Sequence, residues 1–74
     1  MRRTVAIGDV VTVELPWSEV CMHMRVAGKR MNVQVLSHRS AQLLNDDGTP
    51  FSFPILAVEA GIYQDKDGLF VVDA

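Results

Sequence analysis

The sequence predicts an all-β fold for this chain of 74 residues, on three observations. First, eleven valines and three isoleucines outnumber six leucines, and β-branched side chains suit a pleated sheet better than a helix surface. Second, apolar and polar residues alternate over several short stretches, as they do in half-buried strands. Third, turn-forming residues recur about every ten positions. Together these patterns favour a small barrel of five to seven short antiparallel strands.

An early strand is predicted around residues 11–15, because Val11, Val13 and Leu15 alternate with polar residues. The alternation resumes over residues 19–36 on both sides of Gly28, where glycine permits a tight turn. We therefore expect residues 19–36 to form two strands of a hairpin. The apolar positions that carry this expectation are Val20, Met22, Met24, Val26, Met31, Val33 and Val35.

Turn residues predict two further hairpins. The run Asn45-Asp46-Asp47-Gly48 would connect strands at residues 41–44 and 51–53. The run Asp65-Lys66-Asp67-Gly68 would connect strands at residues 62–64 and 69–72. Between them, Pro54 removes a backbone donor, so residues 54–60 form either an edge strand or one short helical turn. We favour the helical turn.

The rhythm of strands resembles that of SH3-like and Sm-like small barrels. It is carried by residues 8–14, a basic segment, residues 33–38 and residues 43–54. The resemblance implies a short helical turn before the last strand, where residues 54–60 lie. The chain has neither the RNA-contacting motifs of Sm proteins nor the acidic loop and aromatic ladder of peptide-binding SH3 domains. The resemblance therefore concerns only the fold, and no binding residue can be assigned from it.

Length and composition indicate one domain over residues 1–74, a single small β-barrel without room for a second core or a large enclosed site. A lone cysteine cannot form an internal disulfide, which favours a reducing compartment and a cytoplasmic protein. No apolar run reaches the roughly 18 residues of a membrane-spanning helix. We expect no membrane partner and no cofactor.

Charge is unevenly distributed along the chain. Residues 21–40 contain four cations and no acid, whereas residues 41–74 contain six acids against one lysine. Such a basic segment could meet phosphates or an acidic protein surface, or it could hold only solvated cations. A sequence pI near 5.5 argues against non-specific nucleic-acid binding. The four cations are Arg25, Lys29, Arg30 and Arg39, and the six acids are Asp46, Asp47, Glu59, Asp65, Asp67 and Asp73.

Trp17 follows a proline in a loop, where it either caps the barrel or stands out as an anchor for a partner. We favour capping, because most tryptophans are largely buried. If Trp17 is instead an anchor, it would contact the partner together with the cations, and the candidate partner-binding residues are then Trp17, Arg25, Lys29, Arg30 and Arg39. A hydrophobic content of 49% in so short a chain predicts uncovered apolar surface, and hence self-association.

The segment Cys21-Met22-His23-Met24 could offer soft ligands, since on a strand Cys21 and His23 share one face and His38 is a third candidate. The spacing of a structural zinc site is missing, so no metal is expected. The same residues give no convincing nucleophile and base, and we expect no enzyme. The sequence favours a non-enzymatic binding or assembly module for a protein partner or for itself. Specific RNA binding and a small-molecule or enzyme site at an inter-subunit axis are the alternatives.

Overall fold

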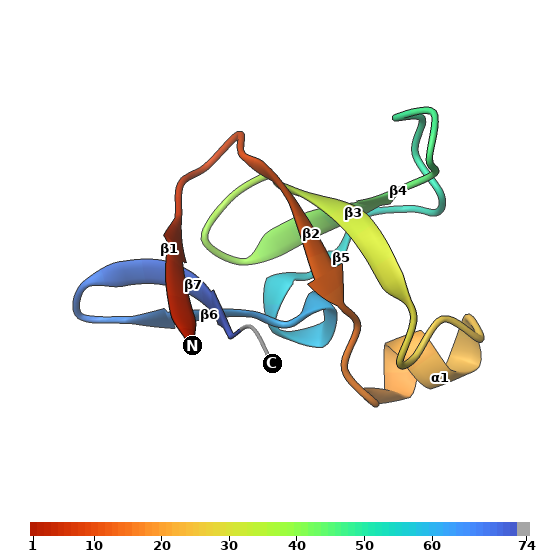
Figure 1. The fold of residues 1–74 in the computed structure, drawn as a ribbon, viewed down its shortest axis with the longest axis horizontal. Coiled ribbons are helices and arrows are strands. Elements are labelled where there is room, and N and C mark those ends of the chain that lie inside the picture. Colours follow the sequence, from red (N-terminus) through yellow and green to blue (C-terminus); the bar gives the residue numbers. More distant parts are fainter. Residues whose placement is uncertain (73–74) are drawn as a thin grey trace.

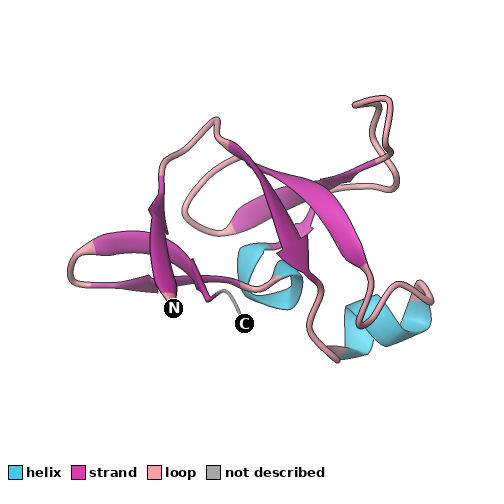
Figure 2. Ribbon diagram, viewed as in Figure 1, coloured by secondary structure: helices cyan, strands magenta, loops and turns pink. Residues whose placement is uncertain are grey.

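Two antiparallel sheets make up most of the computed structural model, which describes residues 1–72 (Figures 1 and 2). The first sheet has the order β1–β7–β6, and the second has the order β2–β3–β4–β5. The strands are β1 (Arg2–Val5), β2 (Val10–Glu14), β3 (Arg30–Val35), β4 (Ser40–Leu44), β5 (Ile55–Leu56), β6 (Ile62–Asp65) and β7 (Gly68–Val72). Seven strands over the described residues confirm the predicted all-β class. Asp73, one of the six acids counted in the sequence, lies outside those residues.

Two short helical segments interrupt the strands. The α-helix α1 (Glu19–His23) connects β2 to β3, and the 3-10 helix η1 (Ala57–Ala60) connects β5 to β6. The short helical turn expected within residues 54–60 is therefore confirmed. The final hairpin is also confirmed, because β6 pairs with β7 from Ile62↔Val71 to Asp65↔Gly68. Neither helical segment of residues 1–72 has the length and apolar character needed to cross a bilayer.

The predicted hairpin over residues 19–36 is wrong in its first half, because residues 19–23 form α1. Ser18 starts the helix: its side chain accepts a hydrogen bond from the Cys21 amide, and Glu19 lies in the first turn. Over five residues, alternation does not separate a strand from a helix with Cys21 on its buried side. Only residues 30–35 form a strand, and β3 pairs with β2 and β4.

The predicted turn at residues 45–48 is present, but the predicted strand at residues 51–53 is absent, so the chain after this turn runs to β5 as a loop. β4 pairs instead with β5, through Ser40↔Leu56 and Ala41↔Ile55. Prolines at both ends of the loop lack the amide donors of a ladder. The loop is held by the buried Gln42, whose side-chain amide donates to the carbonyl oxygen of Ser52 at 2.5 Å. The expected pairing survives only next to the turn, as the bridge Leu44↔Pro50 and the hydrogen bonds from the amides of Asn45 to Thr49 O and of Phe51 to Leu43 O, each 2.8 Å long.

The hydrophobic core lies between the two sheets and is closed by α1 and η1. Val33, Val35 and Leu43 come from the second sheet, Ile62 and Val71 from the first. The helical segments add Cys21, Ala57 and Ala60 to the same cluster. All eight side chains are at most 3% exposed, so the core is dense although each element is short. The helical segments are therefore part of the core.

We expect Leu43→Ala to lower the free energy of unfolding by about 2–5 kcal/mol, because it leaves a cavity among closely packed side chains. Leu43 is fully buried, whereas Leu56 is 53% exposed. The matched change Leu56→Ala should cost under about 1 kcal/mol. Urea unfolding followed by circular dichroism measures both, and equal losses would contradict the described core.

Candidate functional site

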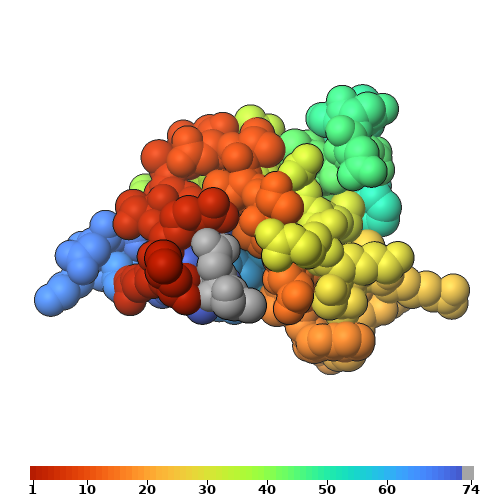
Figure 3. Space-filling view, viewed as in Figure 1, coloured from red at the N-terminus to blue at the C-terminus, as the bar shows by residue number. Residues whose placement is uncertain are grey.

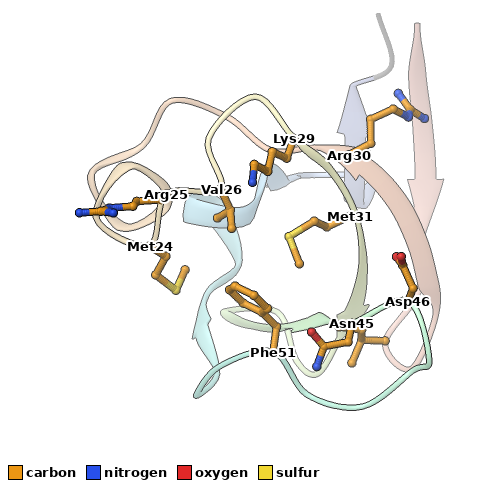
Figure 4. Close-up of a pocket in the computed structure, with 10 residues that line it drawn as sticks. Met24, Arg25, Val26, Lys29, Arg30, Met31, Asn45, Asp46 and Phe51 are labelled. Carbon is orange, nitrogen blue, oxygen red and sulfur yellow. The ribbon is translucent and has the colours of Figure 1, made fainter.

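Three of the predicted binding residues, Arg25, Lys29 and Arg30, line one hollow of about 450 Å³ (Figure 4). We call this hollow the groove. Two separate parts of the chain form it: the segment from the end of α1 into β3, and the end of β4 with the loop that follows. The other residues that line it are Met24, Val26, Met31, Leu44, Asn45, Asp46 and Phe51.

The floor of the groove is apolar. In Figure 4 the side chains of Met24, Met31 and Phe51 converge on the same space, and Lys29 extends over it. Arg25 and Arg30 point away from the centre on opposite sides. Methionine is flexible and polarizable and adapts to different apolar partners. The groove thus combines an adaptable apolar floor with cations at its rim.

Arg25 has a backbone conformation that usually requires glycine. Its φ of 61° is the one positive φ of a non-glycine residue within residues 1–72. Arg25 directly follows α1, and the next amide, that of Val26, donates to the carbonyl oxygen of Cys21 at 2.9 Å. Helices commonly end this way with glycine, and another L-residue there costs about 1–2 kcal/mol. The strain places a guanidinium at the rim of the groove, which is typical of a residue kept for function.

We expect Arg25→Gly to raise the free energy of unfolding by about 0.5–1 kcal/mol, since the relieved strain exceeds the added freedom of the unfolded chain. Arg30→Gly is the matched control, because Arg30 begins β3 and has no positive φ. This variant should lower the free energy of unfolding by about 0.5–1 kcal/mol. Thermal unfolding of the two variants checks the signs. A loss of stability in Arg25→Gly would contradict the left-handed conformation.

The rim cations have no internal charge partner. Neither Arg25, Lys29 nor Arg30 has a carboxylate within ion-pair distance among residues 1–72. In the first sheet, by contrast, Arg2 pairs with Asp65 and lies 3.6 Å from the centroid of the Phe70 ring. The groove therefore carries a local positive charge, although the whole chain has a net charge of −2.

The opposite wall of the groove is a hydrogen-bonded loop at residues 45–49. Asp47 accepts hydrogen bonds from the Thr49 hydroxyl at 2.6 Å and from the Thr49 amide at 3.0 Å. These bonds, the hydroxyl first, favour the carboxylate and lower the pKa of Asp47 below its ordinary value. The Asn45 side-chain amide also donates to Thr49 Oγ1 at 3.0 Å. The loop is thus ordered by its own contacts before any ligand binds.

Removal of the hydroxyl in Thr49→Val should raise the pKa of Asp47 toward its ordinary value. Because the folded-state pKa is lowered, the contact stabilises the loop above the ordinary aspartate pKa of about 3.9 and is lost as the pH falls through the lowered value. An NMR titration of the side-chain carboxyl carbons measures the shift. Thr12→Val, at a distant threonine, should leave the Asp47 curve unchanged, and an equal shift there would contradict the assignment.

Trp17 is 74% exposed, so the prediction that it caps the barrel as a buried side chain is wrong. Leu15 takes the buried position instead, and its backbone exchanges hydrogen bonds with Gly28 and Lys29, each 2.8 Å long. The indole lies against Gly28, where an added Cβ would come within 3.2 Å of Cζ2. Trp17 therefore stands beside the turn that carries Lys29 without lining the groove.

Arg39 is not brought together with the other candidates. It lines a separate hollow with His38, Leu56 and Tyr63, between β5 with η1 and β6. The four cations of the basic segment are therefore divided between two surfaces, with three at the groove and one at the second hollow.

The cysteine and histidines do not form a site. Cys21 is buried and its thiol donates to the carbonyl oxygen of Glu59 at 3.2 Å. His23, two positions later on a helix, faces elsewhere and is exposed. His38 lies beyond β3. In the described part of the chain, no three His, Cys, Asp or Glu residues stand together as metal ligands.

Sequence reasoning missed the apolar floor of the groove. The sequence predicts Met24 and Met31 as apolar positions of a hairpin, whereas in the structure both are partly buried against the core and line the groove. Phe51 was assigned to a strand and is 41% exposed in the loop. One sequence feature could have indicated that Phe51 lies in a loop. Prolines on both sides of Phe51-Ser52-Phe53 disfavour a strand and leave two aromatic side chains in a loop.

Comparison of the chain with protein-family models, with curated proteins and with solved structures found no match.

Proposed function

We propose that this protein is a non-enzymatic binding module that recognises an acidic segment of a protein partner. The segment inserts an apolar side chain between Met24, Met31 and Phe51, and its carboxylates meet Arg25, Lys29 and Arg30. The observation that carries the proposal is the set of three rim cations that have no carboxylate partner within residues 1–72, around an open apolar floor. Unpaired cations beside an apolar anchor site give orientation and contact area together.

The composition of the groove favours a protein segment over RNA. Single-stranded RNA is usually bound by stacking bases on several aromatic side chains along a basic track. Here Phe51 is the one aromatic residue among those lining the groove, and the rest of the floor is methionine, valine and leucine. A net charge of −2 also opposes long-range attraction of a polyanion. A short acidic segment needs only the local cations.

We further propose that the fold is an SH3-like or Sm-like barrel. The order of the second sheet, β2–β3–β4–β5, followed by η1 and then β6, supports this assignment. In folded domains generally, binding residues are concentrated on loops that a rigid scaffold positions. The groove lies between such connections, at the end of α1 and after β4.

A direct test is to titrate the isotope-labelled protein with a blocked peptide that has one phenylalanine between glutamates, and to follow backbone amide NMR shifts. The shifts should concentrate at residues 24–31 and 44–51. Because the attraction is electrostatic, affinity should fall as salt is added. Lys29→Glu should weaken binding by about tenfold or more, which corresponds to roughly 1.4 kcal/mol.

Arg39→Glu is the matched control, since it makes the same charge change outside the groove. It should change affinity by less than about twofold. Equal weakening by both variants would show only a non-specific charge effect and would contradict the proposal. Tighter binding of a single-stranded oligonucleotide than of the peptide, at the same salt, would favour the RNA alternative.

A further inference from the structure

The apolar floor continues beyond the groove at both ends. Met24 also lines a hollow over α1, together with Val20 and Met22. Phe51 also lines a hollow along the loop after β4, together with Phe53. Three neighbouring hollows are thus joined through two shared side chains. We call the resulting surface the belt; its residues are Val20, Met22, Met24, Met31, Phe51 and Phe53.

The ends of the belt are well exposed. Met22 is 48% exposed and Phe53 is 89% exposed, and neither belongs to the hydrophobic core. Single exposed apolar side chains are ordinary, but a continuous series of them on a small protein is typical of an interaction surface. The cations Arg25, Lys29 and Arg30 lie at its middle. Asp46 also lines the groove and Glu19 the hollow over α1, so cations exceed acids only at the middle of the belt. A partner that matches the belt is therefore apolar along its length and acidic near its centre.

The strands that line the groove, β3 and β4, have no free edge, and β5, the outer strand next to Phe53, is only two residues long. β3 is paired on both sides, by β2 and β4. β4 is covered by β5 at Ser40 and Ala41, and by the following loop beyond them, where the Phe51 amide donates to the carbonyl oxygen of Leu43 at 2.8 Å. An extended peptide thus finds only the two residues of β5 as a free edge, too few to add a strand along the belt. A helix needs none, because its backbone hydrogen bonds are internal.

We propose that the belt binds an acidic amphipathic α-helix of a partner protein. Its apolar stripe lies along the belt from Met22 to Phe53, and carboxylates beside the stripe meet the three cations of the groove. Methionines at two central positions let the surface adjust to the side chains of the helix. This inference rests on the proposed function, because the groove is the middle part of the belt.

The probe is a synthetic peptide of about four helical turns with leucines at i, i+3, i+4 and i+7 spacing and glutamates elsewhere. A second peptide has the same composition with the leucines scrambled, so that no apolar stripe forms. Binding is measured by isothermal calorimetry and helix formation by circular dichroism. The amphipathic peptide should bind at least about tenfold more tightly than the scrambled one and gain helicity on binding.

Met22→Ser and Phe53→Ser test the two ends of the belt. Both side chains are exposed, so the variants should keep the thermal stability of the parent protein. Each should lower the affinity for the amphipathic peptide by about three- to tenfold. The affinity for the short phenylalanine peptide, which binds in the groove, should stay unchanged. Leu36→Ser, an exposed apolar position outside the belt, is the matched control and should have no effect.

The outcomes separate the belt from the groove. If Lys29→Glu weakens the helical peptide but Met22→Ser and Phe53→Ser do not, the belt is overturned and the groove stands. If neither the helical nor the short peptide binds, the proposed function fails as well. If a proline-rich acidic peptide binds more tightly than the amphipathic peptide, the proposal that the partner segment is a helix is overturned. Light scattering that shows a dimer disrupted by Phe53→Ser, with no peptide binding, would make the belt a contact between copies of this chain.

Discussion

The carbonyl oxygen of Glu59 joins the two helical segments, and the rest of the structure depends on this contact. It accepts hydrogen bonds from Ser18 Oγ at 2.9 Å and from Cys21 Sγ at 3.2 Å. The same Ser18 caps α1, and the same Cys21 is its fully buried side chain, so one point fixes both the start and the orientation of the helix. The end of α1 then has a defined place, and with it Met24 and Arg25 at the groove.

The groove combines two locally unfavourable features, a positive φ at Arg25 and cations without an ion-pair partner within residues 1–72. Elsewhere in the described residues, positive φ angles fall on glycines, whereas Arg25 holds one without being glycine. In the first sheet, Arg2 forms an ion pair with Asp65 and packs on the Phe70 ring, whereas within residues 1–72 the rim cations form no ion pair. A strained backbone and uncompensated cations both reduce stability unless something else stabilises them. Their coincidence at one place is what distinguishes this surface from the ordinary exterior of a small all-β domain.

Chain length explains why so much apolar surface is left uncovered. A domain of this size buries only about 60% of the surface of its unfolded chain. Valines, leucines and the alanines of η1 fill the core, which leaves the larger and more flexible side chains outside it. Of the belt residues, Met22, Phe51 and Phe53 are exposed, and Met24 and Met31 are only partly buried against the core. Figure 3 shows α1 (orange to yellow) and the loop after β4 (green) projecting on the same side of the molecule. Adaptable side chains are therefore concentrated where a partner has access.

The sequence by itself determined the all-β class, the strand around Val11 and Val13, the helical turn before β6 and the final hairpin at Asp65–Gly68. These follow from local causes: β-branched residues, period-two alternation and turn chemistry act within a few positions. It did not determine α1, because five residues of alternating pattern fit a helix as well as a strand until Ser18 and Cys21 find Glu59, 41 and 38 positions away. Nor did it show that Arg25, Lys29 and Arg30 share a groove with Phe51 while Arg39 does not, or that Trp17 lies outside the core. Those are relations between segments distant in sequence, and only the packing of the two sheets decides them.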